Sequence, residues 1–206
     1  PRTCSYSVSN WVSRWSPIAD GVSMTDIWLV RHGEASAGFG EDTDPGLSPL
    51  GHDQAQAAAR LLAPVVPEDA TLLTSPKRRA RETGDPFAAS REQDLEVHPC
   101  FIELPSPGDL AQRQTWIQHV LKASWRDLPT QVATWQGDIF KALQACTTPA
   151  VIFTHFLVIN SVASKISGDD AVVQCLPDNG SVHHLRINGS EWYWVSRGQM
   201  LESIVN

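Results

Sequence analysis

The sequence predicts an α/β protein, a three-layer α/β/α sandwich around a mostly parallel sheet, with a helical cap inserted after the third strand. Short apolar runs of the kind found in buried strands occur along the chain. They alternate with longer segments of helical periodicity, which is typical of a sheet covered by helices on both faces. A chain of 206 residues is long enough for one such domain and too short for two ordinary ones.

The first strand is expected at residues 27–30, a run of β-branched, aromatic and aliphatic side chains. A loop rich in Gly, Asp and Pro follows over residues 35–46. Ser48 is a good N-cap and is followed by proline, which fits the first turn of a helix. We therefore expect a helix over residues 49–62, ended by Pro64.

The middle of the chain predicts two more strands, at residues 70–74 and 95–97, with a helix that opens near Pro76 between them. Two further segments have helical periodicity and are separated by a proline: residues 110–122 and 130–144. Because both lie between two predicted strands, we assign residues 104–146 to the cap.

The last part of the chain predicts a buried strand at residues 150–154 and a helix that runs to about Ile166. Two alternating segments then close the domain as a hairpin, residues 181–187 and 191–196. The turn between them is expected at Asn188-Gly189, a favoured two-residue hairpin sequence.

Residues 1–23 differ in composition from the rest, and we treat them as an extension outside a domain that covers residues 24–206. The Ser-rich flanks favour a disordered or non-native segment. The alternative is a short amphipathic turn, because Val8, Trp11 and Trp15 lie near helical spacing.

Net charge excludes one class of partner. A value of −7, with a pI near 5.4, argues against a general nucleic-acid binder, which needs a broad basic surface.

No apolar run approaches the roughly 20 residues of a membrane helix, so no membrane partner is predicted. The four cysteines form no C-x-x-C pair, which favours free thiols and a cytoplasmic protein. The oligomeric state does not follow from the sequence.

Arg31 and His32 stand directly behind the first predicted strand. The ligands of open α/β sheets collect at the carboxyl ends of such strands. An imidazole beside a permanently charged guanidinium suits a nucleophile that attacks a phosphorus atom bearing anionic oxygens. The alternative interpretation is an ordinary loop.

Two more basic residues occupy corresponding places. Ser75, Arg79 and Thr83 fall at i, i+4 and i+8, so Arg79 is expected to point inward from one helix face. His155 follows the strand at 150–154 and opens a helix, whose free N–H groups favour an anion. The alternatives are a solvated basic helix end and a core histidine.

Glu103 lies in an apolar context after the third predicted strand. Burial there would raise the pKa of the carboxyl toward the range in which it can donate a proton to a leaving alkoxide. The alternative is a surface glutamate at the start of a loop.

Taken in order, five blocks of this chain resemble those of the histidine phosphatase superfamily, which has the phosphoglycerate mutase-like fold. The resemblance extends from Ile27 to about Leu185. The blocks are Arg31-His32-Gly33-Glu34, Leu47-Ser48-Pro49-Leu50-Gly51, the run from Thr74 to Thr83, Glu103, and Thr154-His155.

The resemblance implies that His32 accepts the phosphoryl group and that Arg31, Arg79 and His155 bind it. Glu103 falls where such enzymes keep their proton donor. The resemblance implies no metal and no cofactor. The leading hypothesis is therefore a metal-independent phosphomonoesterase that works through a phosphohistidine and takes a small phosphorylated metabolite as substrate.

Departures from the family pattern define the alternatives. Ala37-Gly38 stand where mutases carry Trp-Asn, which favours a phosphatase over a phosphoglycerate-type mutase. A protein-phosphohistidine phosphatase is a further alternative. The sequence after Glu103 also departs from the family pattern and Phe156 replaces a usual Gly, so a catalytically inactive relative that binds a phosphorylated ligand is the second alternative.

Several residues of the cap segment could contribute to substrate binding. Arg113 and Lys122 could bind additional negative charge on a substrate. Three tryptophans of the segment could stack on a substrate, with core packing as the favoured alternative: Trp116, Trp125 and Trp135.

Overall fold

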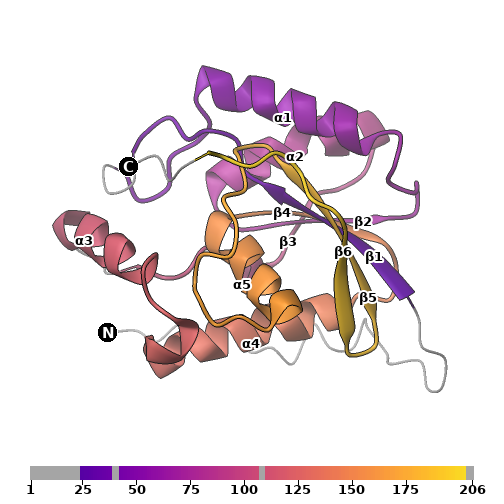
Figure 1. Ribbon diagram of the computed structural model, residues 1–206. Coiled ribbons are helices and arrows are strands. Elements are labelled where there is room, and N and C mark those ends of the chain that lie inside the picture. The colour runs from indigo at the N-terminus through magenta and orange to yellow at the C-terminus, as the bar shows by residue number, and fades with distance from the viewer. Residues whose placement is uncertain (1–23, 39–41, 107–109, 203–206) are drawn as a thin grey trace.

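A six-stranded sheet with the strand order β3-β2-β4-β1-β5-β6 forms the centre of the protein (Figure 1). The strands are β1 (Met24–Arg31), β2 (Thr71–Thr74), β3 (Glu96–Val97), β4 (Ala150–Thr154), β5 (Val182–Asn188) and β6 (Glu191–Ser196). Neighbours from β3 to β1 pair in parallel, whereas β5 pairs with β1 and β6 in the antiparallel sense. The computed structural model describes residues 24–38, 42–106 and 110–202, so the predicted extension at 1–23 lies outside the described residues.

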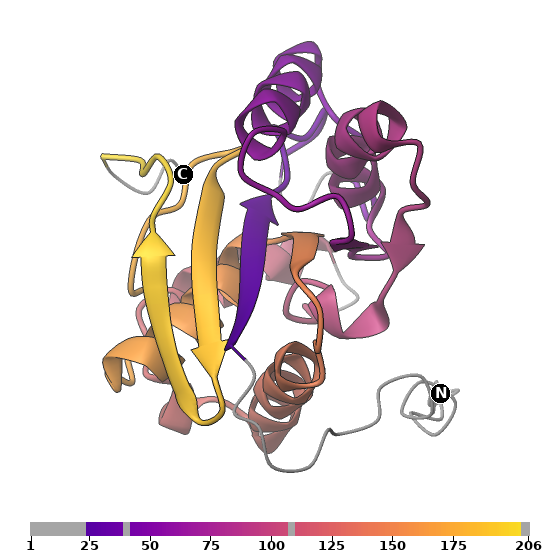
Figure 2. The same ribbon diagram turned by 90° about the vertical axis from the view of Figure 1, so that its right-hand side faces the viewer.

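Helices cover both faces of this sheet. One face carries α1 (Pro49–Leu62) and α2 (Arg78–Arg91), and the other carries α4 (Thr130–Gln144) and α5 (Phe156–Ser167) (Figures 1 and 2). The predicted three-layer α/β/α sandwich with a mostly parallel sheet is confirmed. None of the described helices is long and apolar enough to cross a bilayer.

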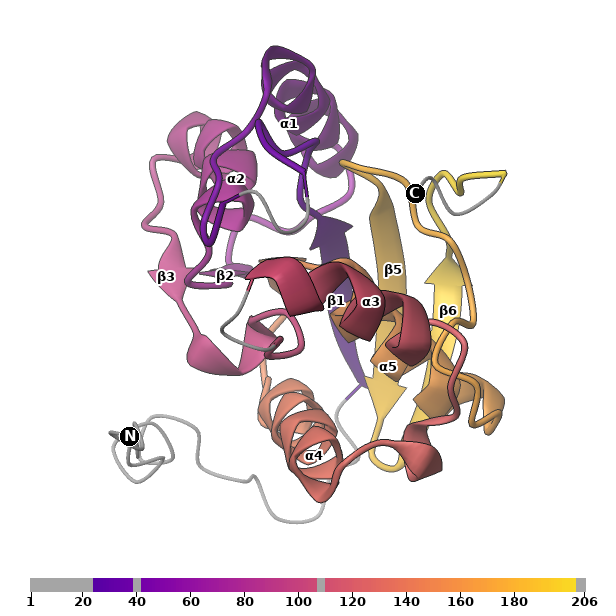
Figure 3. The ribbon, with the colours of Figure 1, turned by 90° about the vertical axis from the view of Figure 1, so that its left-hand side faces the viewer.

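Two helices come from the segment 104–146, which the sequence predicts as a cap. The helix α3 (Leu110–Val120) lies on the side of the molecule toward which β1 points in Figure 1, so it is seen in front of β1 in Figure 3. The helix α4 contributes Ile139 and Leu143 to the same apolar cluster as β1 and β4. Within the described part of this segment, α4 therefore belongs to the layer that covers the sheet.

The alternation of side chains along β1 divides the core into two clusters. Ile27 and Leu29 face α4 and α5, whereas Trp28 and Val30 pack with α1 and α2. All four side chains are buried. Full burial of such a side chain contributes about 1.5–3 kcal/mol, so this strand is anchored on both faces. Its carboxyl end is consequently a fixed point for the residues that follow it.

The structure differs from the predicted elements mainly at their ends. The strand β1 starts three residues earlier than predicted, at Met24, because it pairs with β5 as far as Asn188. The hairpin turn is shifted by one residue, since Asn188 pairs with Glu191. Gly189 takes the left-handed φ of 60° that this turn requires.

A close contact between two glycines joins the loop after β1 to the start of α1. A Cβ atom on Gly33 would lie 2.5 Å from the carbonyl oxygen of Gly51. A Cβ atom on Gly51 would overlap the carbonyl oxygen of Glu34. Ser48 caps the helix by accepting the N–H of Gly51 at 3.0 Å, and its hydroxyl donates to Glu34 Oε1 at 2.7 Å. The loop that carries His32 therefore rests directly on the helix backbone.

We expect Gly51→Ala to lower the free energy of unfolding by about 1–3 kcal/mol, because the backbone of Glu34 must move to admit the methyl group. Gly137→Ala is the matched control. Gly137 lies inside α4, and a Cβ atom added there would have no neighbour within 4 Å, so alanine should stabilise the protein by about 0.5–1 kcal/mol. Urea denaturation of both variants measures these changes, and equal stabilities would contradict the glycine contact.

Candidate active site

Three of the predicted site residues come from the carboxyl ends of parallel neighbours in the sheet. Arg31 ends β1 and His32 follows it, and His155 follows β4. The backbone N–H of His32 donates to the carbonyl of Thr154 at 2.9 Å, which joins the two strand ends. The next strand along, β2, ends before Ser75, whose N–H donates to Phe153 in β4. The fold thus brings these residues to one edge of the sheet.

His32 is held with a defined tautomer. Its Nδ1 lies 2.7 Å from the carbonyl oxygen of Gly33, which can only accept, so Nδ1 carries the proton. Arg79 Nε donates to His32 Nε2 at 3.0 Å, which requires a lone pair on that nitrogen. Both contacts agree on the same tautomer. The bare nitrogen, which is the one that can act as a nucleophile, therefore faces the guanidinium of Arg79.

Arg79 lies between the two histidines. Its Nη2 is 3.3 Å from Nδ1 of His155, and the rings of His32 and His155 meet edge to face with centroids 5.1 Å apart. Thr83, one turn further along α2, donates to the Arg79 carbonyl at 2.7 Å and accepts from the N–H of Gly33 at 3.0 Å. The predicted inward face of α2 is therefore present, and Thr83 connects it to the loop that holds His32.

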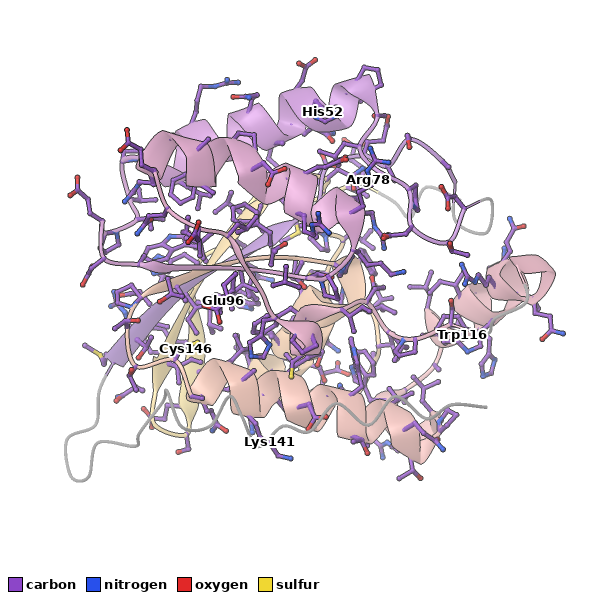
Figure 4. All side chains as sticks on the ribbon, turned by 180° about the vertical axis from the view of Figure 1, so that it is seen from behind. His52, Arg78, Glu96, Trp116, Lys141 and Cys146 are labelled. Atoms are coloured by element: carbon purple, nitrogen blue, oxygen red, sulfur yellow. The ribbon has the colours of Figure 1, made fainter. Side chains whose placement is uncertain are left out.

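Neighbouring cations on α2 point elsewhere. Arg78 donates to Glu82 Oε1 at 2.6 Å on an exposed side of the helix, as its i, i+4 spacing predicts. Figure 4 shows Arg78 at the start of α2. Lys77 Nζ donates to the carbonyl of Thr43 at 2.9 Å. Of the basic residues in this run, Arg79 is the one that contacts the histidines.

Arg31 is fixed from two sides. Its Nη1 donates to the carbonyl of Pro177 at 2.6 Å, and its guanidinium lies 5.3 Å from the centre of the Phe156 ring. Its Nε is buried and has no hydrogen-bond partner among the described residues. A buried guanidinium donor without an acceptor is costly, so this group is available for an anionic oxygen.

Glu103 accepts two backbone hydrogen bonds. The N–H of Leu104 donates to Oε1 at 3.0 Å, and the N–H of Leu157 in the first turn of α5 donates to Oε2 at 3.3 Å. Burial raises the pKa of this carboxyl, while these two bonds and the charges of Arg79 and Arg31 act in the opposite direction. The bond to Leu157 ties Glu103 to the start of α5, the helix that His155 precedes.

Both histidines are held in the neutral form. Burial, followed by the charges of Arg79 and Arg31, lowers the pKa of His32 well below its ordinary value. Burial and Arg79 act in the same way on the pKa of His155, which is fully buried. At neutral pH the site therefore combines two guanidinium cations with two uncharged imidazoles. An oxyanion is the natural complement of this set of donors.

Two residues that contact the site were not among the site residues predicted from the sequence. Ser75 lies 2.7 Å from His155 Nε2, and Pro177 contributes a backbone carbonyl. The i, i+4 spacing of Ser75 and Arg79 is the one signal in the sequence that indicates Ser75, although α2 begins at Arg78 and Ser75 lies before the helix. Pro177 could not be found from residue types, because it acts through its main chain.

Arg113 and Lys122, which are predicted to bind additional negative charge on a substrate, lie on or near α3. Lys122 is exposed, and its role stays a prediction, as does that of Arg113. Trp125 and Trp135 are buried in the apolar core with ring centroids 6.1 Å apart. Trp116 is partly buried against the same cluster and lies on α3 (Figure 4). The structure thus assigns these tryptophans to packing.

Comparison with known families gives one match that covers most of the chain. The model of the histidine phosphatase superfamily (branch 1) matches residues 27–199. No curated protein matches the sequence.

Solved structures resemble the fold over most of its length. A mycobacterial glucosyl-3-phosphoglycerate phosphatase, solved with VO3, has a TM-score of 0.65 and 20% identity, covering 84% of this chain and 98% of that one. A protein described as mycobacterial hydrolase 1 has a TM-score of 0.67 and 19% identity, with coverage of 86% and 100%. A candidate alpha-ribazole-5'-P phosphatase from Escherichia coli has a TM-score of 0.65 and 18% identity, with coverage of 88% and 99%. At these identities the likeness establishes the fold.

Proposed function

Because the chain belongs to the histidine phosphatase superfamily, we propose that it is a metal-independent phosphomonoesterase that works through a phosphohistidine on His32. The observation that carries this proposal is the bare Nε2 of His32, which faces Arg79 while Nδ1 donates to Gly33. This lone pair accepts the Arg79 hydrogen bond in the free protein, and it becomes available to attack an electrophilic phosphorus atom when the guanidinium donates to the phosphoryl oxygens instead.

In the first step, Nε2 of His32 forms a bond to phosphorus while the bond between phosphorus and the ester oxygen breaks. Glu103 in its protonated form gives its proton to the leaving oxygen, so an alcohol departs. Arg31, Arg79 and His155 stabilise the charge on the non-bridging oxygens, which supplies most of the catalysis in phosphoryl transfer. The two arginines also favour the negatively charged substrate in the ground state.

In the second step, a water molecule attacks the phosphorus atom of phosphohistidine. The carboxylate of Glu103 takes a proton from this water, and the bond between nitrogen and phosphorus breaks. Inorganic phosphate leaves, and His32 regains its lone pair. Glu103 thereby returns to its protonated form, and the cycle needs no metal ion.

We propose a small phosphorylated metabolite as the substrate. The similar structures named as phosphatases of glucosyl-3-phosphoglycerate and alpha-ribazole-5'-P support this class of substrate through their shared fold. The three described cysteines outside the extension are unpaired thiols, which supports a cytoplasmic location.

A panel of phosphate esters, assayed with chelator and without added metal, tests this function. We expect release of inorganic phosphate and, after rapid acid-free quenching with a ³²P-labelled ester, a label on the protein that acid removes and base does not. Transfer of the phosphoryl group to another position of the substrate would identify a mutase instead. Turnover of a phosphohistidine protein alone would identify a protein phosphatase, and binding of esters without any turnover would contradict an enzymatic function.

A further inference from the structure

Ser75 and His155 form a hydrogen-bonded pair that is completely buried. Both side chains have 0% exposure, and Ser75 Oγ lies 2.7 Å from His155 Nε2. Ser75 Oγ also accepts the backbone N–H of Lys77 at 3.2 Å. The hydroxyl has one proton, so the direction of its bond to the imidazole decides which ring nitrogen of His155 is protonated.

The hydroxyl proton of Ser75 has one acceptor among the described residues, which is Nε2 of His155. If Nε2 carried the imidazole proton, Ser75 Oγ would accept from both His155 and Lys77 and its own proton would remain buried without an acceptor. Such an unsatisfied group is costly for a hydroxyl that has no exposure to solvent. The separation of 2.7 Å is also the usual one for a hydroxyl donor. The hydrogen bonds therefore favour Nε2 as the acceptor and Nδ1 as the protonated nitrogen.

With this tautomer, the contact between His155 Nδ1 and Arg79 on the other side of the ring is not a hydrogen bond. Nδ1 of His155 and Nη2 of Arg79 are 3.3 Å apart, and both then carry hydrogens. Two donors do not bond to each other, but both can donate to one oxygen placed between them. An oxygen of a phosphoryl group has the lone pairs for two such bonds.

We propose that Ser75 is a positioning residue that keeps the proton of His155 on Nδ1, so that His155 and Arg79 donate together to one phosphoryl oxygen. The inference rests on the proposed function for the identity of the ligand. Under this proposal, His155 Nδ1 and Arg79 Nη2 are both donors before the ligand binds. Binding therefore does not have to include the free-energy cost of changing the tautomer of His155. The lowered pKa of His155 is consistent with a single ring proton.

Nitrogen-15 NMR of the histidine rings in the ligand-free protein tests the proposal directly. The His155 signals are assigned by their loss in His155→Gln. In the wild type, the proton is expected on Nδ1. In Ser75→Ala, the neighbouring Arg79 donor should draw a lone pair to Nδ1 and move the proton to Nε2. A wild-type proton on Nε2, or an unchanged proton position in Ser75→Ala, would overturn the proposal.

Binding and turnover supply the functional readout. We expect Ser75→Ala to weaken the binding of inorganic phosphate and to lower kcat/KM by about 10- to 100-fold, the effect of losing one buried hydrogen bond. Thr74→Val is the matched control, because Thr74 is equally buried and, among the described residues, its hydroxyl donates to the backbone carbonyl of Ser75. This variant should keep the Nδ1 proton and the phosphate affinity.

The two proposals can fail separately. A wild type that hydrolyses esters but protonates Nε2 of His155 would contradict the role of Ser75 alone. A wild type with the Nδ1 proton and Ser75-dependent phosphate binding, but without turnover, would contradict the phosphatase function alone. If Ser75→Ala does not fold, the wild-type spectrum still decides the tautomer, and Ser75→Cys replaces the variant because a thiol is a weak donor of similar shape.

Discussion

His32→Ala is expected to lower kcat for phosphate esters by about 10⁴-fold or more, because the variant lacks the nitrogen to which the phosphoryl group is transferred. The loss should be of the same order for esters with good and poor leaving groups, since both need the nucleophile. The guanidinium of Arg79, which donates to His32 in the free protein, remains in place to bind an anion. Binding of inorganic phosphate should therefore persist. Steady-state kinetics and a phosphate titration measure the two quantities.

His119→Ala is the control for this experiment. His119 is an exposed histidine on α3, so its replacement should leave turnover unchanged. Wild-type turnover in His32→Ala, with a folded protein by circular dichroism, would exclude the phosphohistidine mechanism. Loss of both turnover and phosphate binding would indicate instead that His32 maintains the shape of the site.

Glu103→Gln is expected to reduce turnover in a way that depends on the leaving group. A glutamine cannot transfer a proton, so kcat for an alkyl phosphate should fall by about 10²- to 10⁴-fold, the usual range for general acid catalysis. A nitrophenyl phosphate needs less protonation of its leaving oxygen and should lose much less. Glu191→Gln, at an exposed position of β6, is the control.

The protonation states of Glu103 and His32 determine how kcat/KM should change with pH. Burial raises the pKa of Glu103, so the carboxyl keeps its proton to a higher pH than an ordinary glutamate. Burial lowers the pKa of His32, so the imidazole keeps its lone pair to a lower pH than an ordinary histidine. Wild-type kcat/KM for an alkyl phosphate should therefore fall as pH rises through the pKa of Glu103, and fall again as pH drops through that of His32. In Glu103→Gln the decline on the alkaline side should disappear, and its persistence would assign the proton to another group.

The elements of the fold followed from local signals in the sequence. Residues 49–62 and 130–144 form helices with the predicted bounds. The N-cap Ser48 marks the start of α1, and Pro129 directly precedes the start of α4. The start of β1 could not be predicted in this way. Met24 joins the strand through its pairing with Asn188 in β5, and such a distant partner leaves no mark on the local sequence.

The candidate site was predictable to the extent that its residues follow apolar strands. Arg31, His32 and His155 could be expected at one edge because parallel strands end together. Arg79 required the helical spacing as well. The carbonyl of Pro177 and the hydroxyl of Ser75 depend on how distant segments pack, which residue types do not reveal.

The place of β1 in the sheet also sets the order in which the protein can form. Its neighbours are β4, which begins at Ala150, and β5, which begins at Val182. During synthesis, Ile27 and Leu29 leave the ribosome before the strands with which β1 pairs. Both of those strands, β4 and β5, lie in the later part of the sequence. Pairings so distant in sequence are slow to close. Arg31 and His32 thus reach their final positions only after β4 and β5 have been synthesised.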